Sequence, residues 1–100
     1  MVVIEKLKEG ISPLYKKYRI AYVDAFGSTA RSEQAQVSDM NLIIEFLEPR
    51  RAGISVRFFG FLHEFEDRFH HKVDLLTEKS SQNPFLKEKV DKDRVRIYGD

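Results

Sequence analysis

The pattern of apolar and polar residues divides the chain into helical and extended segments. Apolar residues recur every three or four positions in residues 4–18 and 54–69, which predicts two amphipathic helices. Gly10 and Pro13 interrupt the first helix, so we predict that it kinks or restarts there, with Ser12 as the cap. The aromatic residues of the second helix follow one stripe, which predicts a packed core face rather than an aromatic box for a ligand.

Four other segments have the composition of strands. They span residues 20–26, 40–47, 72–77 and 94–98, and the last of them predicts an edge strand. A short helical turn is predicted at residues 29–33, and Asn83-Pro84 predicts the start of a helix that ends near Val90. Helices and strands therefore alternate along the chain. This order predicts an α/β (α+β) fold, in which helices pack on a small mixed β-sheet.

Length and composition narrow the class of protein. A chain of 100 residues is sufficient for one modest core, so we predict a single domain over residues 1–100. The net charge of +1 gives no general attraction for nucleic acids or anionic membranes, and any anion site must be local. The absence of cysteine excludes disulfides and thiolate metal sites. No apolar run approaches the length of a membrane span, which predicts a cytoplasmic protein without a membrane partner. The sequence is compatible with a homo-oligomer.

The stretch AFGSTARSEQAQVSDMNLIIEF, residues 25–46, contains the strongest chemical signal. Gly27 and Ser28 follow a predicted strand and precede a helical turn, where a glycine, a hydroxyl and free amide groups can hold a phosphate. Gly-Ser pairs are common at ordinary turns, so this signal alone is weak. Asp39 and Asn41 stand two apart at the start of the next strand, so their side chains point to the same face about 7 Å apart.

A third oxygen ligand stands in the predicted strand of residues 72–77. Asp74 lies among apolar residues, and a carboxylate there needs a partner or an ion. With Asp39 and Asn41 it can form a metal site if the two strands are neighbours, but the same residues can equally be solvated strand ends. Asp24 raises the same question and can equally pair with a nearby Lys or Arg.

The combination of FGSTAR, SDMNLIIEF and HKVDLLT resembles the minimal nucleotidyltransferases, small members of the DNA polymerase β superfamily. The resemblance covers nearly the whole chain, with three motifs in order and at the family's spacing, and it implies the nucleotidyltransferase fold. It also implies that Gly27, Ser28 and Arg31 bind a nucleoside triphosphate. By the same resemblance, Asp39, Asn41 and Asp74 take the catalytic and metal-binding positions for one or two Mg²⁺ ions.

The resemblance further implies an activity and a partner. Such an enzyme moves a nucleoside monophosphate, AMP in the case of ATP, to a hydroxyl group by metal-assisted phosphoryl transfer. Family members of this size often accompany a helical HEPN-domain toxin as its antitoxin, and some adenylylate one of its tyrosines. We therefore expect a HEPN-domain protein as the partner of this chain.

Two positions depart from the family pattern. Asn41 stands where the family has aspartate, and Ser32 stands where it has glycine. An amide oxygen can coordinate Mg²⁺ but carries no charge, so Asn41 leaves open whether the chain is an enzyme. The alternative is an inactive module that binds nucleotide or partner and neutralises a toxin by occlusion. A third interpretation is that Asn41 was introduced to trap an active enzyme.

Overall fold

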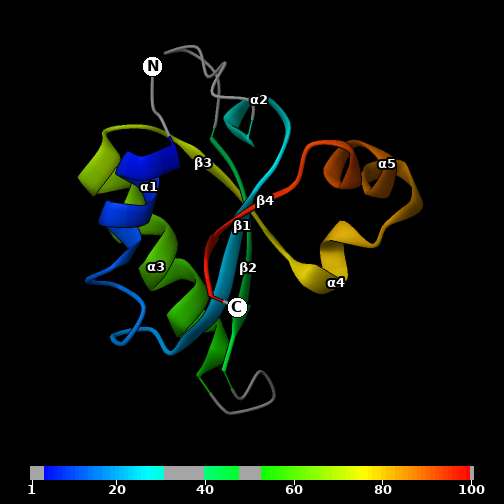
Figure 1. The fold of residues 1–100 in the computed structure, drawn as a ribbon. Coiled ribbons are helices and arrows are strands. Elements are labelled where there is room, and N and C mark those ends of the chain that lie inside the picture. Colours follow the sequence, from blue (N-terminus) through cyan, green and yellow to red (C-terminus); the bar gives the residue numbers. More distant parts are fainter. Residues whose placement is uncertain (1–3, 31–39, 48–52, 100) are drawn as a thin grey trace.

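A four-stranded mixed sheet forms the centre of the structure (Figure 1). The computed structural model describes residues 4–30, 40–47 and 53–99, without the side chains of Ile4, Ser28 and Lys89. The strand order is β3-β2-β1-β4, in which β1 is antiparallel to β2 and β4, and β2 is parallel to β3. The elements are α1 (Ile4–Ile11), β1 (Ile20–Ala25), α2 (Gly27–Ala30), β2 (Met40–Phe46), α3 (Ile54–Phe69), β3 (Val73–Thr77), α4 (Glu78–Ser81), α5 (Pro84–Lys92) and β4 (Val95–Tyr98). The predicted fold class is confirmed.

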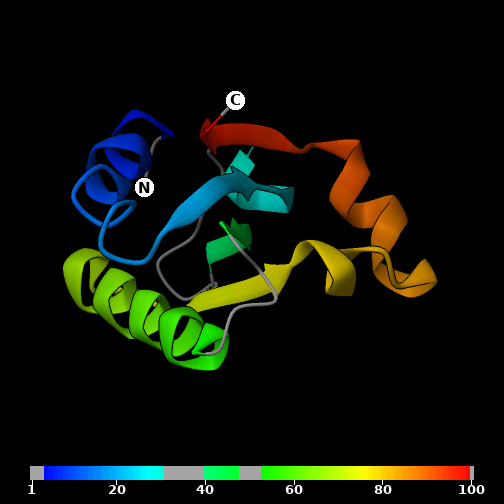
Figure 2. The same cartoon turned by 90° about the horizontal axis from the view of Figure 1, so that it is seen from below.

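The helices cover the two faces of the sheet unequally. α1 and α3 lie together on one face, whereas α4 and α5 lie on the other (Figure 2). The main core is on the α1 and α3 side, where Phe61 and Phe65 are fully buried. The predicted aromatic stripe of α3 therefore packs in the core. A smaller core, formed by Phe26, Ile43 and Val90, joins α5 to the opposite face.

The alternation of β2 assigns its residues to these two faces. Met40, Leu42 and Ile44 are buried in the main core, whereas Ile43 belongs to the smaller one. Because side chains two apart on a strand share a face, Asn41 lies on the same face as Ile43. This second face carries the polar residues of the candidate site.

The start and the end of the chain differ from the prediction in detail. α1 ends at Ile11, and residues 12–19 form successive turns instead of a restarted helix. Pro13 explains the early end, because proline lacks an amide donor and disfavours helical geometry at the residue before it. The start of α5 is as predicted, since the Asn83 side chain accepts a hydrogen bond of 2.9 Å from the amide of Phe85. The four-residue helix α4 was not predicted.

No helix among the described residues is long and apolar enough to cross a membrane.

Candidate functional site

Asn41 and Asp74 lie side by side on neighbouring strands. β2 and β3 pair in parallel, and their register places Asn41 directly opposite Asp74. Neighbouring strands are about 4.8 Å apart, so these two side chains share one face at close range. The sequence prediction required β2 and β3 to be neighbours, and that condition is confirmed.

Gly27 brings the turn after β1 close to Asn41. Its φ angle is +58°, in the left-handed region where glycine is favoured. A Cβ atom at this position would stand 3.1 Å from Nδ2 of Asn41. The backbone conformation therefore favours glycine here, and a side chain at this position would crowd Asn41. The backbone of α2 follows this turn at once, beginning at Gly27 rather than at the predicted Thr29.

Thr29 fixes the start of β2 against this turn. It is fully buried, and its Oγ1 accepts a hydrogen bond of 2.8 Å from the amide of Asn41. The amide of Phe26 donates to the carbonyl oxygen of Asn41 at 3.1 Å. These two bonds hold the backbone of Asn41 between the end of β1 and α2. Sequence reasoning missed the role of Thr29, and its only signal was a hydroxyl residue directly after Gly27-Ser28.

Gly27, Asn41 and Asp74 line a cavity of about 410 Å³, which we call the polar cavity. Its lining consists of Phe26, Gly27, Asn41, Asp74, Leu86, Lys92 and Asp93. The last three come from α5 and from the residue that follows it, so the cavity lies between the sheet and the end of this helix. The structure thus brings three of the predicted site residues together and adds Lys92 and Asp93, which sequence reasoning did not single out.

The remaining predicted site residues are only partly covered by the described part of the chain. Asp39 and Arg31 lie outside the described residues, and for Ser28 only the backbone is described. Asp74 is exposed to solvent, which corrects the expectation that its carboxylate is desolvated within an apolar strand. Water can therefore satisfy this carboxylate, and burial alone gives no argument for a metal.

The metal ligands can be assessed in part. Within residues 4–30, 40–47 and 53–99, no three His, Cys, Asp or Glu side chains come together as a metal site. Asn41 and Asp74 still offer one amide oxygen and one carboxylate on the same face. Mg²⁺ prefers oxygen ligands and commonly keeps several waters, so this pair fits part of a Mg²⁺ coordination shell.

An ionic cluster occupies the same sheet face beside the polar cavity. Asp24 of β1 is almost completely buried and pairs with Nε of Arg94 at 2.5 Å and also with Arg96. Arg94 also reaches Glu78 of α4 with two bonds of 2.7 and 3.0 Å. Of the alternatives that the sequence left open for Asp24, the structure thus shows the pairing with arginine. We use the name ionic cluster for Asp24, Glu78, Arg94, Arg96, Tyr22 and Ser81.

The protonation of the ionic cluster follows from these contacts. The hydrogen bonds from Arg94 lower the pKa of Glu78 to about 2, although partial burial opposes this shift. Burial raises the pKa of Tyr22 to about 12, and its hydrogen bond of 2.6 Å to Glu78 adds to the rise. Ser81 donates a further bond of 2.8 Å to Glu78. Glu78 therefore stays ionised at neutral pH and Tyr22 stays protonated, so that Tyr22, Ser81 and Arg94 all donate to the same carboxylate.

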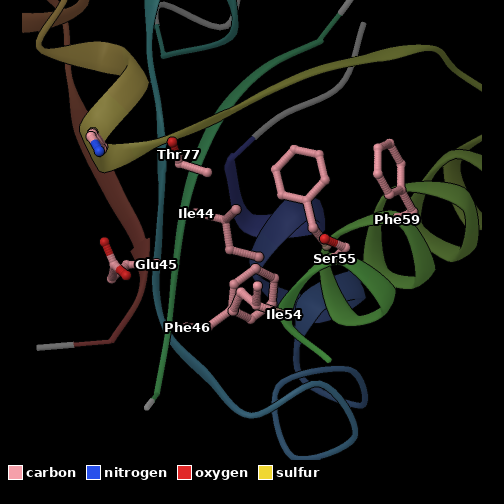
Figure 3. A pocket seen from close by; sticks show the side chains of 9 residues that line it. Ile44, Glu45, Phe46, Ile54, Ser55, Phe59 and Thr77 are labelled. Atoms are coloured by element: carbon pink, nitrogen blue, oxygen red, sulfur yellow. The ribbon is translucent and has the colours of Figure 1, made fainter. Parts of the chain in front are cut away.

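A second cavity, also of about 410 Å³, lies at the other end of β2 and is mainly apolar (Figure 3). Ile44 and Phe46 of β2 face Ile54 of α3 there, and Phe59 stands at its rim. Asn41 lines the polar cavity and Glu45 lines the second one, and the Cα atoms of these two residues are roughly 13 Å apart along the strand. The apolar cavity contains none of the predicted site residues. The polar cavity is therefore the candidate active site.

Comparison with known proteins assigns the family. The sequence model of the nucleotidyltransferase domain family matches residues 4–97 of this chain. The chain belongs to this family. The resemblance of the three sequence motifs to the minimal nucleotidyltransferases is thus confirmed, and the polar cavity is the part of this nucleotidyltransferase domain where those motifs meet.

Curated relatives and solved structures agree with the family. The Methanocaldococcus jannaschii proteins MJ0126 and MJ1379, provisionally named protein adenylyltransferases, are each 32% identical over 93% of this chain and 92% of their own length. A solved structure provisionally described as a minimal nucleotidyltransferase is 26% identical, with a TM-score of 0.71 over 94% of this chain and 95% of its own. A toxin–antitoxin structure with AMP-PNP shares the fold at 16% identity, with a TM-score of 0.67 over 93% of this chain and 73% of that one.

Another solved complex shares the fold at lower identity. It contains a tri-AMPylated Shewanella oneidensis HEPN toxin and an MNT antitoxin. The matched chain is 14% identical, with a TM-score of 0.63 over 98% of this chain and 74% of that one. At this level of identity, the likeness concerns the fold of the nucleotidyltransferase domain.

Proposed function

We propose that this nucleotidyltransferase domain binds ATP in the polar cavity and transfers AMP to a hydroxyl group of a partner protein. The observation that carries the proposal is the pairing of Asn41 with Asp74 beside the left-handed turn at Gly27. Three motifs that are separate in the sequence thereby meet at one cavity. The names of the M. jannaschii relatives support protein adenylylation as the type of reaction.

The residues at the polar cavity have different roles in this reaction. The backbone of the Gly27 turn lies close to Asn41 and offers amide groups to phosphate oxygens. Asn41 and Asp74, with Asp39 by resemblance, would hold Mg²⁺, which when bound neutralises charge on the phosphates. The attacking hydroxyl oxygen forms a bond to the α-phosphorus while the bond to the pyrophosphate breaks. In this proposal, the exposed carboxylate of Asp74 accepts the proton of that hydroxyl.

The partner that we propose is a HEPN-domain protein, and the acceptor is a tyrosine of that protein. The solved complex of an AMPylated HEPN toxin with an MNT antitoxin supports this choice, since its antitoxin shares the fold of this chain. In this proposal the chain acts as an antitoxin, because the transferred AMP alters the toxin.

Asn41 sets the rate in this proposal. An amide at this position removes one negative charge from the metal-binding face. Losses at pre-organised electrostatic groups are on the order of 10²–10³ in rate. We therefore expect slow transfer by the chain as it stands and faster transfer by Asn41→Asp.

The deciding experiment measures transfer of label from α-labelled ATP, with Mg²⁺ or Mn²⁺, to a HEPN-domain protein. The unaltered chain, Asn41→Asp and Asp39→Ala are compared. Transfer that rises in Asn41→Asp and disappears in Asp39→Ala supports the proposal. If Asn41→Asp also transfers nothing while the partner is still bound, the second candidate function holds instead. That candidate is an inactive module that neutralises the partner by binding, and the observation that favours it is the amide at position 41.

A further inference from the structure

Among the described residues that line the polar cavity, Lys92 is the only cation. It is the last residue of α5, and it lies across the cavity from the strand ends that carry Asn41 and Asp74. We propose that the ammonium group of Lys92 is a phosphate-binding group of this site and contacts the phosphoanhydride chain of the nucleotide. This inference rests on the ATP-binding function proposed above and adds a residue to it.

The contacts of Lys92 leave its charge available. Its side chain is exposed and makes no hydrogen bond or ion pair with another residue of the described part of the chain. Lys87, on the same helix, behaves differently: its ammonium group lies 3.6 Å from Asp91 and donates a bond of 3.0 Å to Gln82. A lysine without a protein partner at the wall of a cavity can bind an anionic ligand without first breaking an ion pair.

The ordinary explanation of Lys92 is that a cation is favoured at the C-terminal end of a helix. The same property of the helix end is a reason why a bound phosphate chain would need the positive charge of Lys92. The C-terminal end of α5 carries partial negative charge and lies at the cavity, where it would repel a phosphate chain. Asp93 and Asp74 add two carboxylates to the same lining. A phosphate chain in this cavity therefore needs a compensating cation on the α5 side, and Lys92 is placed there.

The ionic cluster holds Lys92 in position. Arg94, two residues further along the chain, is fixed by Asp24 of β1 and by Glu78 of α4. Val90, two residues before Lys92, is buried in the smaller core against Ile43. The backbone on both sides of Lys92 is thus anchored to the sheet. Only the flexible side chain of Lys92 has to move to reach a bound phosphate.

The test is the affinity for ATP, measured by isothermal titration in buffer with Mg²⁺. The variants are Lys92→Met, which removes the charge but keeps an unbranched side chain, and Lys92→Arg, which keeps the charge. Lys87→Met is the matched control, because it removes a cation from the same helix outside the cavity. Melting temperatures establish that each variant is folded.

The proposal expects Lys92→Met to bind ATP about 10-fold more weakly, the usual effect of one charge-assisted hydrogen bond. Lys92→Arg and Lys87→Met should remain close to the unaltered chain. Equal affinity of Lys92→Met and the unaltered chain would overturn the inference. So would an equal loss in Lys92→Met and Lys92→Arg, because the role would then be packing rather than charge. If the unaltered chain does not bind ATP at all, the proposed function itself fails, and this result is distinct from the other two.

Discussion

The ionic cluster and the polar cavity lie on the same face of one sheet, and both are built from charged and polar residues. In the cluster, Asp24 is buried and its two carboxylate oxygens form ion pairs with Arg94 and Arg96, so its charge is neutralised within the protein. In the cavity, Asp74 and Lys92 are exposed and have no partner within the described residues. The difference teaches that charge on a sheet face supports the fold where it is paired internally and is available for ligands where it is not.

The main core on the other face gives a reference for both regions. There α1 and α3 bury apolar side chains such as Leu7, Phe61 and Phe65 completely. This packing provides the non-directional part of the stability. The second face can therefore carry directional interactions, and its two regions are expected to respond differently to mutation.

The largest effect is expected from Asp24→Ala in the ionic cluster. The change leaves Arg94 and Arg96 without their buried carboxylate, and breaking a buried pair costs about 3–5 kcal/mol of unfolding free energy. Urea denaturation of the variant and of the unaltered chain measures this loss. A loss below about 1 kcal/mol, the usual upper value for surface pairs, would show that the cluster does not stabilise the fold.

The next effect concerns Gly27→Ala. A side chain in the left-handed region costs about 1–2 kcal/mol. The new Cβ also crowds Asn41, so ATP binding should be lost as well. Gly53→Ala is the matched control, since Gly53 has a φ of +90° but no atom within 4 Å of the added Cβ. Both variants should lose stability, and only Gly27→Ala should lose ATP affinity. Equal ATP affinity in the two would contradict the assigned role of the turn.

Acid should destabilise the ionic cluster by protonating Glu78. Its folded-state pKa of about 2 lies below the ordinary value of 4.5, so its ionisation stabilises the fold above pH 4.5. This contribution is lost as the pH falls from 4.5 towards 2. We expect the melting temperature to fall in this interval, and to fall less steeply in Glu78→Gln. Identical pH profiles of the two proteins between pH 4.5 and 2 would exclude Glu78 as a source of acid sensitivity.

The smallest effect on stability is expected from Asp74→Asn in the polar cavity. Because this carboxylate is exposed and has no partner among the described residues, its removal should change the unfolding free energy by no more than about 0.5 kcal/mol. The same variant should lose AMP transfer. A loss of stability comparable to that of Asp24→Ala would show that the two regions are not different in kind.

Much of the fold could be predicted from the sequence. The helix of residues 54–69, the cap at Asn83 and the four strands follow from periodicity and local side-chain chemistry, and the structure confirms them. The restart of α1 after Pro13 was wrong, because the local turn preferences of residues 12–19 outweighed a helical spacing of apolar residues. α4 was missed since four residues carry no detectable period.

The candidate site could be predicted less completely. Gly27, Asn41 and Asp74 were identified from motifs, and the structure brings them together. Thr29 lies within FGSTAR and Lys92 lies in none of the three motifs, and neither residue was singled out from the sequence. Their roles depend on what the fold places opposite them.

The sequence by itself determined where most of the helices and strands lie, and its motifs predicted a site at the Gly27-Ser28 turn and at Asp39, Asn41 and Asp74. Only the tertiary structure decided that Asn41 stands opposite Asp74, that Asp24 pairs with Arg94 70 residues away, and that Lys92 faces the same cavity. The physical reason is that helix and strand preferences act over a few residues along the chain. Strand register and ion pairing depend instead on how distant elements pack on the two faces of the sheet.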